Sequence, residues 1–437
     1  MEFGKHLGKG IWGIADKALP VVYGVGFVVL VVRVLPEHEL GSFVLLQELF
    51  LVISGLGTAL ALQPLLKFGA EDREDHSGDL SAAVLLNLAF LVPAGVLCVA
   101  ARHPLAALLN APALSGLLLS MPGLLATSFV RNVTLTVLQS RLRMKELFWT
   151  DAAHFLGFPF LIWVLSRRGM FDSAADLVTI NLATFAASSV LGAWFARGLL
   201  RFRRRGFAGE MRRAWDYGKF SLAGVVSYLF FSRADSFVLS AFTGPVQVAV
   251  YTSAKIFVRI YEMVTQVVQM FVLPVTSRLA SRGEADDLRA LVEKAIAFTT
   301  VATLPVMVLF LAGSTRVLDA VYHGRYAEAA PLLMVFSLLT FIVPAQAVAS
   351  NVLLGLGKAR EGFVIGAQTL ALGLGAYFLL VPPLGALGAA IGYVVTSLVL
   401  AVLSVRIMNR TLPLTVGGVL GRTRDISNFV RNRMRKG

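Results

Sequence analysis

The sequence has almost no cysteine, and it has no recognisable catalytic motif. Its one cysteine, Cys98, lies inside an apolar stretch, which excludes an internal disulfide and a cysteine-based zinc cluster. The six histidines are far apart in the sequence, so they predict no metal site. There is no G-x-S-x-G, no P-loop, no H-E-x-x-H and no Gly-rich dinucleotide fingerprint. We therefore expect no enzyme activity and no bound cofactor or metal.

Charged residues are also scarce, and the acidic ones are scarcer than the basic ones. Only 15% of residues are charged, 57% are hydrophobic, and the mean hydropathy is +0.74. This composition is too apolar for a soluble domain of this length. The net charge of +14 indicates no nucleic-acid partner, because the basic residues lie in short loops between apolar runs. In such loops they orient the chain and contact anionic membrane lipids.

What the chain has instead is a series of twelve apolar runs. Each run is close to or above the length of about 17 to 25 residues that a tilted helix needs to cross a bilayer. The sequence therefore predicts an all-α polytopic membrane protein. The predicted spans are 18–35, 40–66, 79–101, 113–139, 149–166, 176–196, 220–242, 248–276, 295–313, 331–355, 362–381 and 385–407.

Lysine and arginine alternate from one side of these spans to the other. Arg33 and Arg406, at the ends of their spans, are counted with the neighbouring loops. The termini and the loops that follow even-numbered spans then hold 30 of the 40 basic residues, the remaining loops hold 6, and 4 lie deeper inside spans. Loops rich in Lys and Arg stay in the cytoplasm. The distribution therefore predicts a multi-pass protein with both termini in the cytoplasm.

A basic segment in the middle of the chain predicts a division into two halves. Prolines support a weak repeat, because Pro36 and Pro64 are 28 residues apart and Pro245 and Pro274 are 29 apart. Halves of six spans would enter the membrane in the same orientation, as parallel repeats around the central cavity of a transporter do. We expect an N-terminal six-helix bundle, a cytoplasmic linker, a C-terminal six-helix bundle and a basic tail, at 1–198, 199–218, 219–408 and 409–437.

The eighth predicted span carries a polar stripe, formed by Lys255, Arg259, Glu262, Gln266 and Gln269. On an uninterrupted α-helix these side chains lie within about 80° of one another. A charge at the bilayer centre costs about 2.5 to 3.5 kcal/mol or more, so the stripe must face water or other protein. One interpretation is a helix-to-helix network around Glu262, and the other is a water-filled cavity. Two cations against one acid favour the cavity.

Four basic residues lie inside predicted spans and away from the span ends, namely Arg131, Arg233, Lys255 and Arg259. Around a shared cavity they would give a net positive field suited to phosphate. Asp235 and Glu262 would neutralise only half of that charge.

Further acidic side chains lie near or inside the spans. Glu48 lies inside the second span and is a further candidate for a polar group in the cavity. Asp16 with Lys17, and Asp151 with His154, lie near predicted cytoplasmic ends. We interpret these four side chains as interfacial anchors.

Several segments resemble the O-antigen-type (Wzx) polysaccharide flippases, which belong to a superfamily with the MATE exporters and lipid II flippases. In RADSFVLSAFTGPVQVAVYTSAK (233–255) the residues that match the family are Asp235, Gly244, Tyr251 and Ala254, whereas Val250 replaces a usual glycine. RVLPEHELGSF (33–43) matches less well, because Leu35 and Leu40 depart from the pattern. Later matching segments are PVTSRLASRG (274–283), YHGRYAEAAPLL (322–333) and VPPLGALGAAIG (381–392).

This resemblance implies a MATE-like fold of about twelve helices in two six-helix bundles, acting as a monomer in a bacterial inner membrane. It also implies that the chain flips an undecaprenyl-diphosphate-linked oligosaccharide outward, alongside polysaccharide polymerase and assembly proteins. Its coupling ion would be H+ or Na+, if it uses one. Asp235, Glu262, Gln266, Gln269 and Glu48 are the candidates for coupling. The alternatives are a MATE-like exporter of small cations and a membrane glycosyl polymerase or ligase, which short outer loops disfavour.

Overall fold

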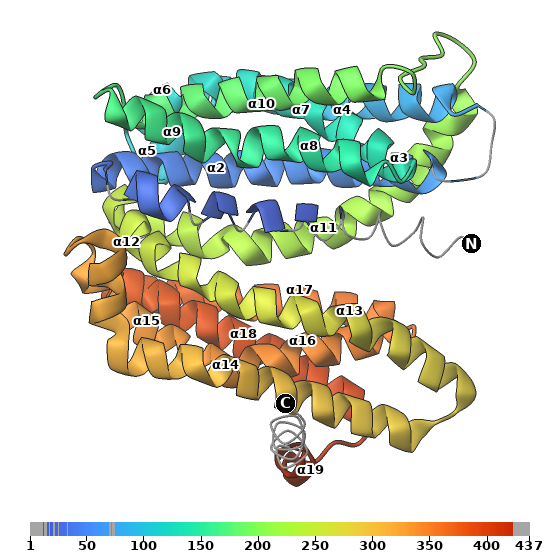
Figure 1. The fold of residues 1–437 in the computed structure, drawn as a ribbon, viewed down its shortest axis with the longest axis vertical. Coiled ribbons are helices and arrows are strands. Elements are labelled where there is room, and N and C mark those ends of the chain that lie inside the picture. The colour runs from blue at the N-terminus through green and yellow to red at the C-terminus, as the bar shows by residue number, and fades with distance from the viewer. Residues whose placement is uncertain are drawn as a thin grey trace, which may run out of the picture. The chain divides into compact units, whose positions relative to one another are not determined.

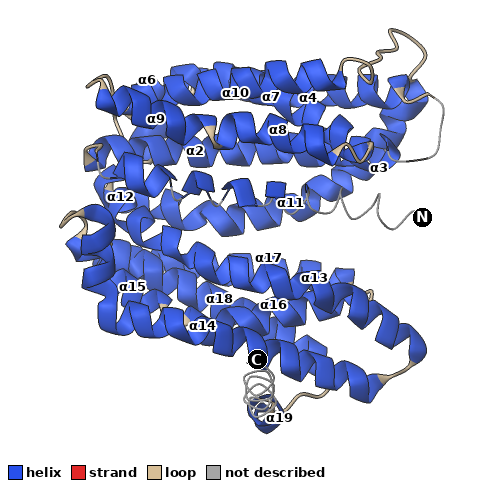
Figure 2. Ribbon diagram, in the orientation of Figure 1, coloured by secondary structure: helices blue, strands red, loops and turns tan. Residues whose placement is uncertain are grey.

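The computed structural model describes residues 12, 15–16, 18–20, 22–24, 26–32, 34–69, 71 and 75–422. Throughout these ranges the regular secondary structure is helical and no strand occurs (Figure 2). The predicted all-α class is therefore confirmed. Arg33, Lys17 and most of the predicted cytoplasmic tail lie outside the described residues.

Contacts divide the chain into unit 1, residues 1–249, and unit 2, residues 250–437 (Figure 1). Unit 1 contains a π-helical turn, η1 (Val28–Val32), and a bundle of further helices of different lengths. They are α2 (Glu37–Gly57) with η2 (Thr58–Leu62) and α3 (Gln63–Gly69), α4 (Ser77–Ala100), α5 (Arg102–Leu108), α6 (Leu114–Leu117) with η3 (Leu118–Ser120) and α7 (Met121–Ser140), α8 (Met144–Phe155), α9 (Gly157–Arg167), α10 (Ala174–Ala196) and α11 (Ala208–Thr243).

Helix α11 packs with unit 1, against α2, η2 and α4. Gly218 makes this packing possible, because a Cβ there would overlap the carbonyl group of Leu60. Gly41 in α2 is equally close to the carbonyl of Pro245. The observed division after Ala249 therefore lies beyond the predicted linker. The second half of that linker, from Ala208, is helical and forms the start of α11.

Unit 2 is a second helical bundle, with a core that includes Val292, Val352 and Met408. The α17–α18 pair packs closely at Gly388 and Gly392, where a Cβ would overlap the Leu380 carbonyl or the Tyr377 ring. Its helices are α12 (Pro245–Lys255, which spans the division), η4 (Ile256–Val258), α13 (Arg259–Arg282), α14 (Ala285–Tyr322), η5 (Ala327–Ala329), α15 (Ala330–Phe336), α16 (Leu339–Gly355), α17 (Ala359–Leu384), α18 (Ala386–Asn409) and α19 (Val416–Gly421).

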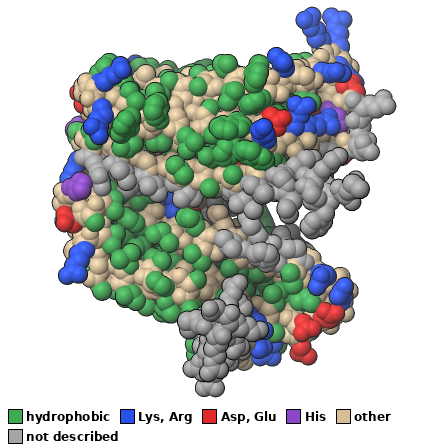
Figure 3. Space-filling model, in the orientation of Figure 1, with side chains coloured by type: hydrophobic (Ala, Val, Ile, Leu, Met, Phe, Trp, Pro, Cys, Tyr) green, Lys and Arg blue, Asp and Glu red, His purple; other side chains and the backbone are tan. Residues whose placement is uncertain are grey.

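Eight helices among the described residues are long and apolar enough to cross a membrane. A ninth span results if α15 and α16, which are bent by 48° at their junction, are counted as one. Hydrophobic side chains cover the middle of the helices and charged side chains gather toward their ends (Figure 3). The chain is thus a multi-pass membrane protein, and the expected total of twelve spans stays a prediction.

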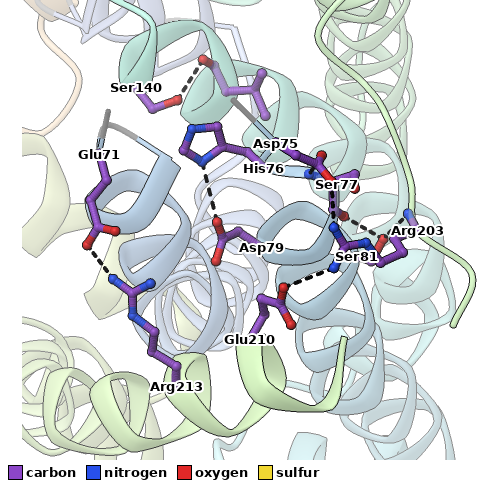
Figure 4. Close-up of polar contacts among 11 residues, drawn as sticks. Glu71, Asp75, His76, Ser77, Asp79, Ser81, Ser140, Arg203, Glu210 and Arg213 are labelled. Atoms are coloured by element: carbon purple, nitrogen blue, oxygen red, sulfur yellow. Dashed lines mark hydrogen bonds and ion pairs between the residues drawn. The ribbon is translucent and has the colours of Figure 1, made fainter. Parts of the chain in front are cut away.

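The loops of unit 1 lie alternately at its two ends, as the distribution of basic residues predicted. At one end Arg203, in the segment before α11, contacts Asp75 at 2.5 Å (Figure 4). At the other end the backbone N–H of Ala174 donates to Glu39 at 2.8 Å. Loops predicted to be cytoplasmic therefore share one end of the unit. That this end faces the cytoplasm stays a prediction.

Candidate functional site

A buried arginine ties three helices of unit 1 together. The side chain of Arg131 in α7, only 9% exposed, donates from Nη2 to the carboxylate of Asp151 in α8. Its Nε donates to Ser188 Oγ in α10 at 3.2 Å. The rings of Phe155 and Phe185 lie 5.4 and 5.8 Å from the guanidinium carbon. Arg131 is therefore neutralised and enclosed within unit 1.

The same helices hold further buried polar contacts. His154 Nδ1 lies 3.1 Å from Thr184 Oγ1, and Asn181 donates to Gln47 at 3.1 Å. The imidazole of His154 is stacked on Phe185, with ring centroids 4.1 Å apart. The prediction that Asp151 and His154 are interfacial anchors is wrong, because Asp151 partners the buried Arg131 and His154 is buried among aromatic rings. Sequence spacing could not reveal this, because the partners lie on different helices.

A second ion pair joins α11 to α2. Arg233 Nη1 lies 2.6 Å from Glu48 Oε2, and the two side chains are 29% and 12% exposed. Nearby in α11, Asp235 is fully buried and accepts a hydrogen bond from the Ser236 backbone N–H at 2.8 Å. The sequence suggested that Asp235 and Glu262 would offset the intramembrane cations. The contacts instead assign Asp151 to Arg131 and Glu48 to Arg233.

In unit 2 the predicted polar stripe is interrupted by a tight turn. Lys255 ends α12, η4 follows, and Arg259 begins α13. A 3-10 turn advances about 20° more per residue than an α-helix, so three residues rotate Lys255 by about 60° from the continuous face. The Lys255 ammonium lies 5.4 and 5.3 Å from the ring centroids of Tyr251 and Tyr393.

The rest of the stripe lies on the outer face of α13. Arg259, Glu262 and Gln266 are exposed, and Gln269 is half-buried. The opposite face holds the buried Tyr261, whose hydroxyl lies 3.0 Å from Thr340 Oγ1. The stripe therefore does not hold unit 2 together. The charged groups on this outer face, Arg259 and Glu262, are available to a ligand or to water.

No cluster of three or more His, Cys, Asp or Glu suited to a metal ion occurs in the part of the chain that the structure describes. Two carboxylates inside unit 1 instead face arginines, in the Arg131–Asp151 and Arg233–Glu48 pairs. The chemistry of the polar groups is thus that of ion pairing, with exposed cations on α13 suited to an anionic ligand.

Comparison with known proteins identifies a family and a set of solved structures with a similar fold. A family model described as polysaccharide biosynthesis protein matches residues 23–331. An uncharacterized membrane protein of Methanocaldococcus jannaschii is 25% identical over 225 residues, which are 50% of this chain and 42% of that protein. The chain thus aligns with less than half the length of this curated relative.

Solved structures with a similar fold are transporters and a flippase. The lipid II flippase MurJ in an inward closed conformation superposes with a TM-score of 0.75 at 12% identity, covering 94% of this chain and 90% of its own. An inward-facing multidrug resistance MATE transporter gives 0.71 at 16% identity, covering 91% and 94%. The chain has the fold of this superfamily, called MOP, and it belongs to the polysaccharide biosynthesis protein family.

Proposed function

We propose that this protein is a flippase that moves an undecaprenyl-diphosphate-linked oligosaccharide from the cytoplasmic to the outer leaflet of a bacterial inner membrane. The observation that carries the proposal is the family match over residues 23–331, because that family serves polysaccharide biosynthesis. The fold similarity to a lipid II flippase supports it. The protein acts as a monomer with both termini in the cytoplasm and supplies polysaccharide polymerase and assembly proteins. It performs no enzymatic step itself.

Lys255 and Arg259 are the residues we assign to the diphosphate. A diphosphate that enters an apolar passage loses hydration, and fixed ammonium and guanidinium donors replace it. Arg259 is exposed on α13, and Lys255 lies beside Tyr251 and Tyr393, whose faces attract a cation. Glu262, one turn from Arg259, weakens the attraction so that the substrate can leave.

Arg131 and Arg233 are assigned a supporting role, because each is already held by a carboxylate. Breaking a buried pair leaves an uncompensated charge, which costs about 3 to 5 kcal/mol. Asp235, Glu48, Glu262, Gln266 and Gln269 stay candidates for coupling to H+ or Na+.

Rescue of surface polysaccharide in a flippase-deficient strain tests this assignment. At matched protein levels, Arg259→Gln should abolish rescue, whereas Arg259→Lys should restore part of it, since lysine keeps the charge but lacks the bidentate fork. Arg360, an exposed residue in the first turn of α17, provides the control, and Arg360→Gln should rescue fully. Full rescue by a variant with both Lys255→Gln and Arg259→Gln would overturn the assignment.

Export of small cations is the second candidate function, and the fold similarity to MATE transporters favours it. A cation exporter needs net negative charge along its route. Lys255 at the end of α12, together with Arg259 and Glu262 in α13, instead carries a net positive charge. Resistance to cationic drugs on expression in a hypersensitive strain, without polysaccharide rescue, would favour the exporter.

A further inference from the structure

A shallow cavity, wide open to its surroundings, lies beside the first turns of α11, and its described lining comes from one face of that helix. The side chains that line it include Arg212, Arg213, Asp216, Tyr217 and Phe220. It lies at the end of unit 1 where Arg213 reaches from α11 to Glu71 (Figure 4).

Basic and aromatic side chains of α3 and α11 stack on one another beside this cavity. The guanidinium carbon of Arg213 lies 3.8 Å from the ring centroid of Phe68. The ammonium of Lys67 lies 4.4 Å from the ring centroid of Tyr217. Arg213 is therefore fixed over an aromatic face as well as by Glu71. Such stacking holds a guanidinium in place while its remaining N–H groups stay able to donate.

The balance of charge around the cavity is positive. Arg212, Arg213, Lys67 and Lys219 carry four positive charges, whereas Glu71 and Asp216 carry two negative ones. Lys219 pairs with Asp216 at 2.6 Å across one helical turn. A ligand with two negative charges would neutralise this excess of positive charge. Guanidinium groups favour phosphate, because their forked donors match two phosphate oxygens.

The cavity also lies where α11 becomes apolar. Phe220 is 74% exposed, and the predicted seventh span begins at this residue. A ligand here can place a charged head against Arg212 and Arg213 while an apolar chain continues along Phe220 toward the bilayer. The combination of diphosphate and long hydrocarbon chain has this shape.

We propose that this cavity is a docking site for the diphosphate headgroup of the polyprenyl-linked substrate, which binds here before it is flipped. The identity of the lipid rests on the proposed function. The predicted orientation supports this order of events, because it places this end of α11 at the cytoplasmic leaflet, from which the proposed flippase takes its substrate. The docking residues are Arg212 and Arg213, with Tyr217 and Phe220 beneath the hydrocarbon chain.

Calorimetric titration with farnesyl diphosphate tests the site in the purified full-length protein. The titration uses a background with Lys255→Gln and Arg259→Gln, which removes the other proposed diphosphate contact. Changing Arg212→Gln and Arg213→Gln together should then weaken binding about tenfold or more, the size expected for loss of charge-assisted hydrogen bonds. Farnesol, which has no diphosphate, should bind more weakly than farnesyl diphosphate by a similar factor.

Glu71→Gln is the matched control, because it breaks the same ion pair as Arg213→Gln from the opposite side. If Arg213 serves the diphosphate, this change frees the guanidinium and binding should tighten. If Arg213 only fastens the loop to α11, Glu71→Gln should weaken binding as the arginine change does, and the proposal is overturned. Competition by phosphatidylglycerol at equal concentration would also overturn it, since the site would then take any anionic lipid.

The rescue assay separates this proposal from the proposed function. If the wild-type protein gives no polysaccharide rescue, the proposed function fails whatever the titration gives. If the wild type rescues and the variant with Arg212→Gln and Arg213→Gln binds farnesyl diphosphate normally, the docking site fails alone. We expect that variant to rescue only at raised substrate supply, because weaker docking lowers occupancy without removing the Lys255 and Arg259 contacts.

Discussion

In unit 1 the intramembrane arginines Arg131 and Arg233 each have a carboxylate partner, whereas in unit 2 Arg259 lies on the exposed face of α13. Arg131 is fixed by Asp151, by Ser188 and between aromatic rings. Arginines inside the predicted spans of the two units therefore have different surroundings. In unit 1 the cation holds helices together, and in unit 2 it is left for a ligand or solvent.

The largest effect should follow from breaking the buried pair of unit 1. Asp151→Asn leaves Arg131 buried without its counter-charge, which should lower the free energy of unfolding by about 3 to 5 kcal/mol. Arg259→Gln should change it by about 0.5 kcal/mol or less, because the side chain is exposed. Thermal unfolding of the purified protein in detergent, followed by tryptophan fluorescence, measures both.

Replacing both partners sharpens the same contrast. A variant with Arg131→Met and Asp151→Leu should be more stable than Asp151→Asn alone, since neither change leaves a buried charge. Equal losses for Asp151→Asn and Arg259→Gln would show that the two units do not differ in this way.

A smaller effect is expected at Glu293, a buried glutamate of unit 2. Glu293, 4% exposed, accepts from Arg289 in α14 and from Arg422 after α19, each at 3.2 Å. A Cβ on Gly418 would overlap the Glu293 carboxylate, while nothing lies within 4 Å of one on Gly417. Gly418→Ala should therefore loosen α19 at a cost of about 1 to 3 kcal/mol, as overpacking does.

Limited trypsin digestion measures this effect, because loosening of α19 separates Arg422 from Glu293 and makes the peptide bond after Arg422 easier to cleave. Gly418→Ala should be cleaved there several times faster than the wild type, and Gly417→Ala should not. Equal cleavage of the two variants would mean that Glu293 does not hold α19 in place.

The smallest effect concerns the exposed ion pair between Asp75 and Arg203. Hydrogen bonds from Ser77, together with Arg203, lower the pKa of Asp75 to about 2. Because the folded-state pKa lies below the unfolded value of about 3.9, the carboxylate stabilises the fold above that value and loses this effect as pH falls toward 2. The thermal midpoint of the wild type should exceed that of Asp75→Asn slightly at pH 6. The two should converge near pH 2, and a constant difference would contradict the assignment.

Much of the fold could be predicted from the sequence. The apolar runs indicate the long helices, and the alternation of basic and other loops indicates which loops share an end of the unit. The shared end of Asp75 and Arg203 in unit 1 was predictable in this way. The partner of Arg131 could not be predicted, because Asp151 lies on another helix and sequence spacing does not distinguish it from other carboxylates. The break between Lys255 and Arg259 was equally hidden, because no proline or glycine marks η4.

The close approach of Gly218 to the Leu60 carbonyl also bears on how the protein is made. A ribosome adds residues in sequence order at about 5 to 20 per second, and membrane helices are released into the bilayer as they emerge. When α10 has left the ribosome, the face of α2, η2 and α4 that α11 covers is still uncovered. Unit 1 can therefore close only after Thr243 has been synthesised. The basic segment before α11 is therefore synthesised while unit 1 is still incomplete.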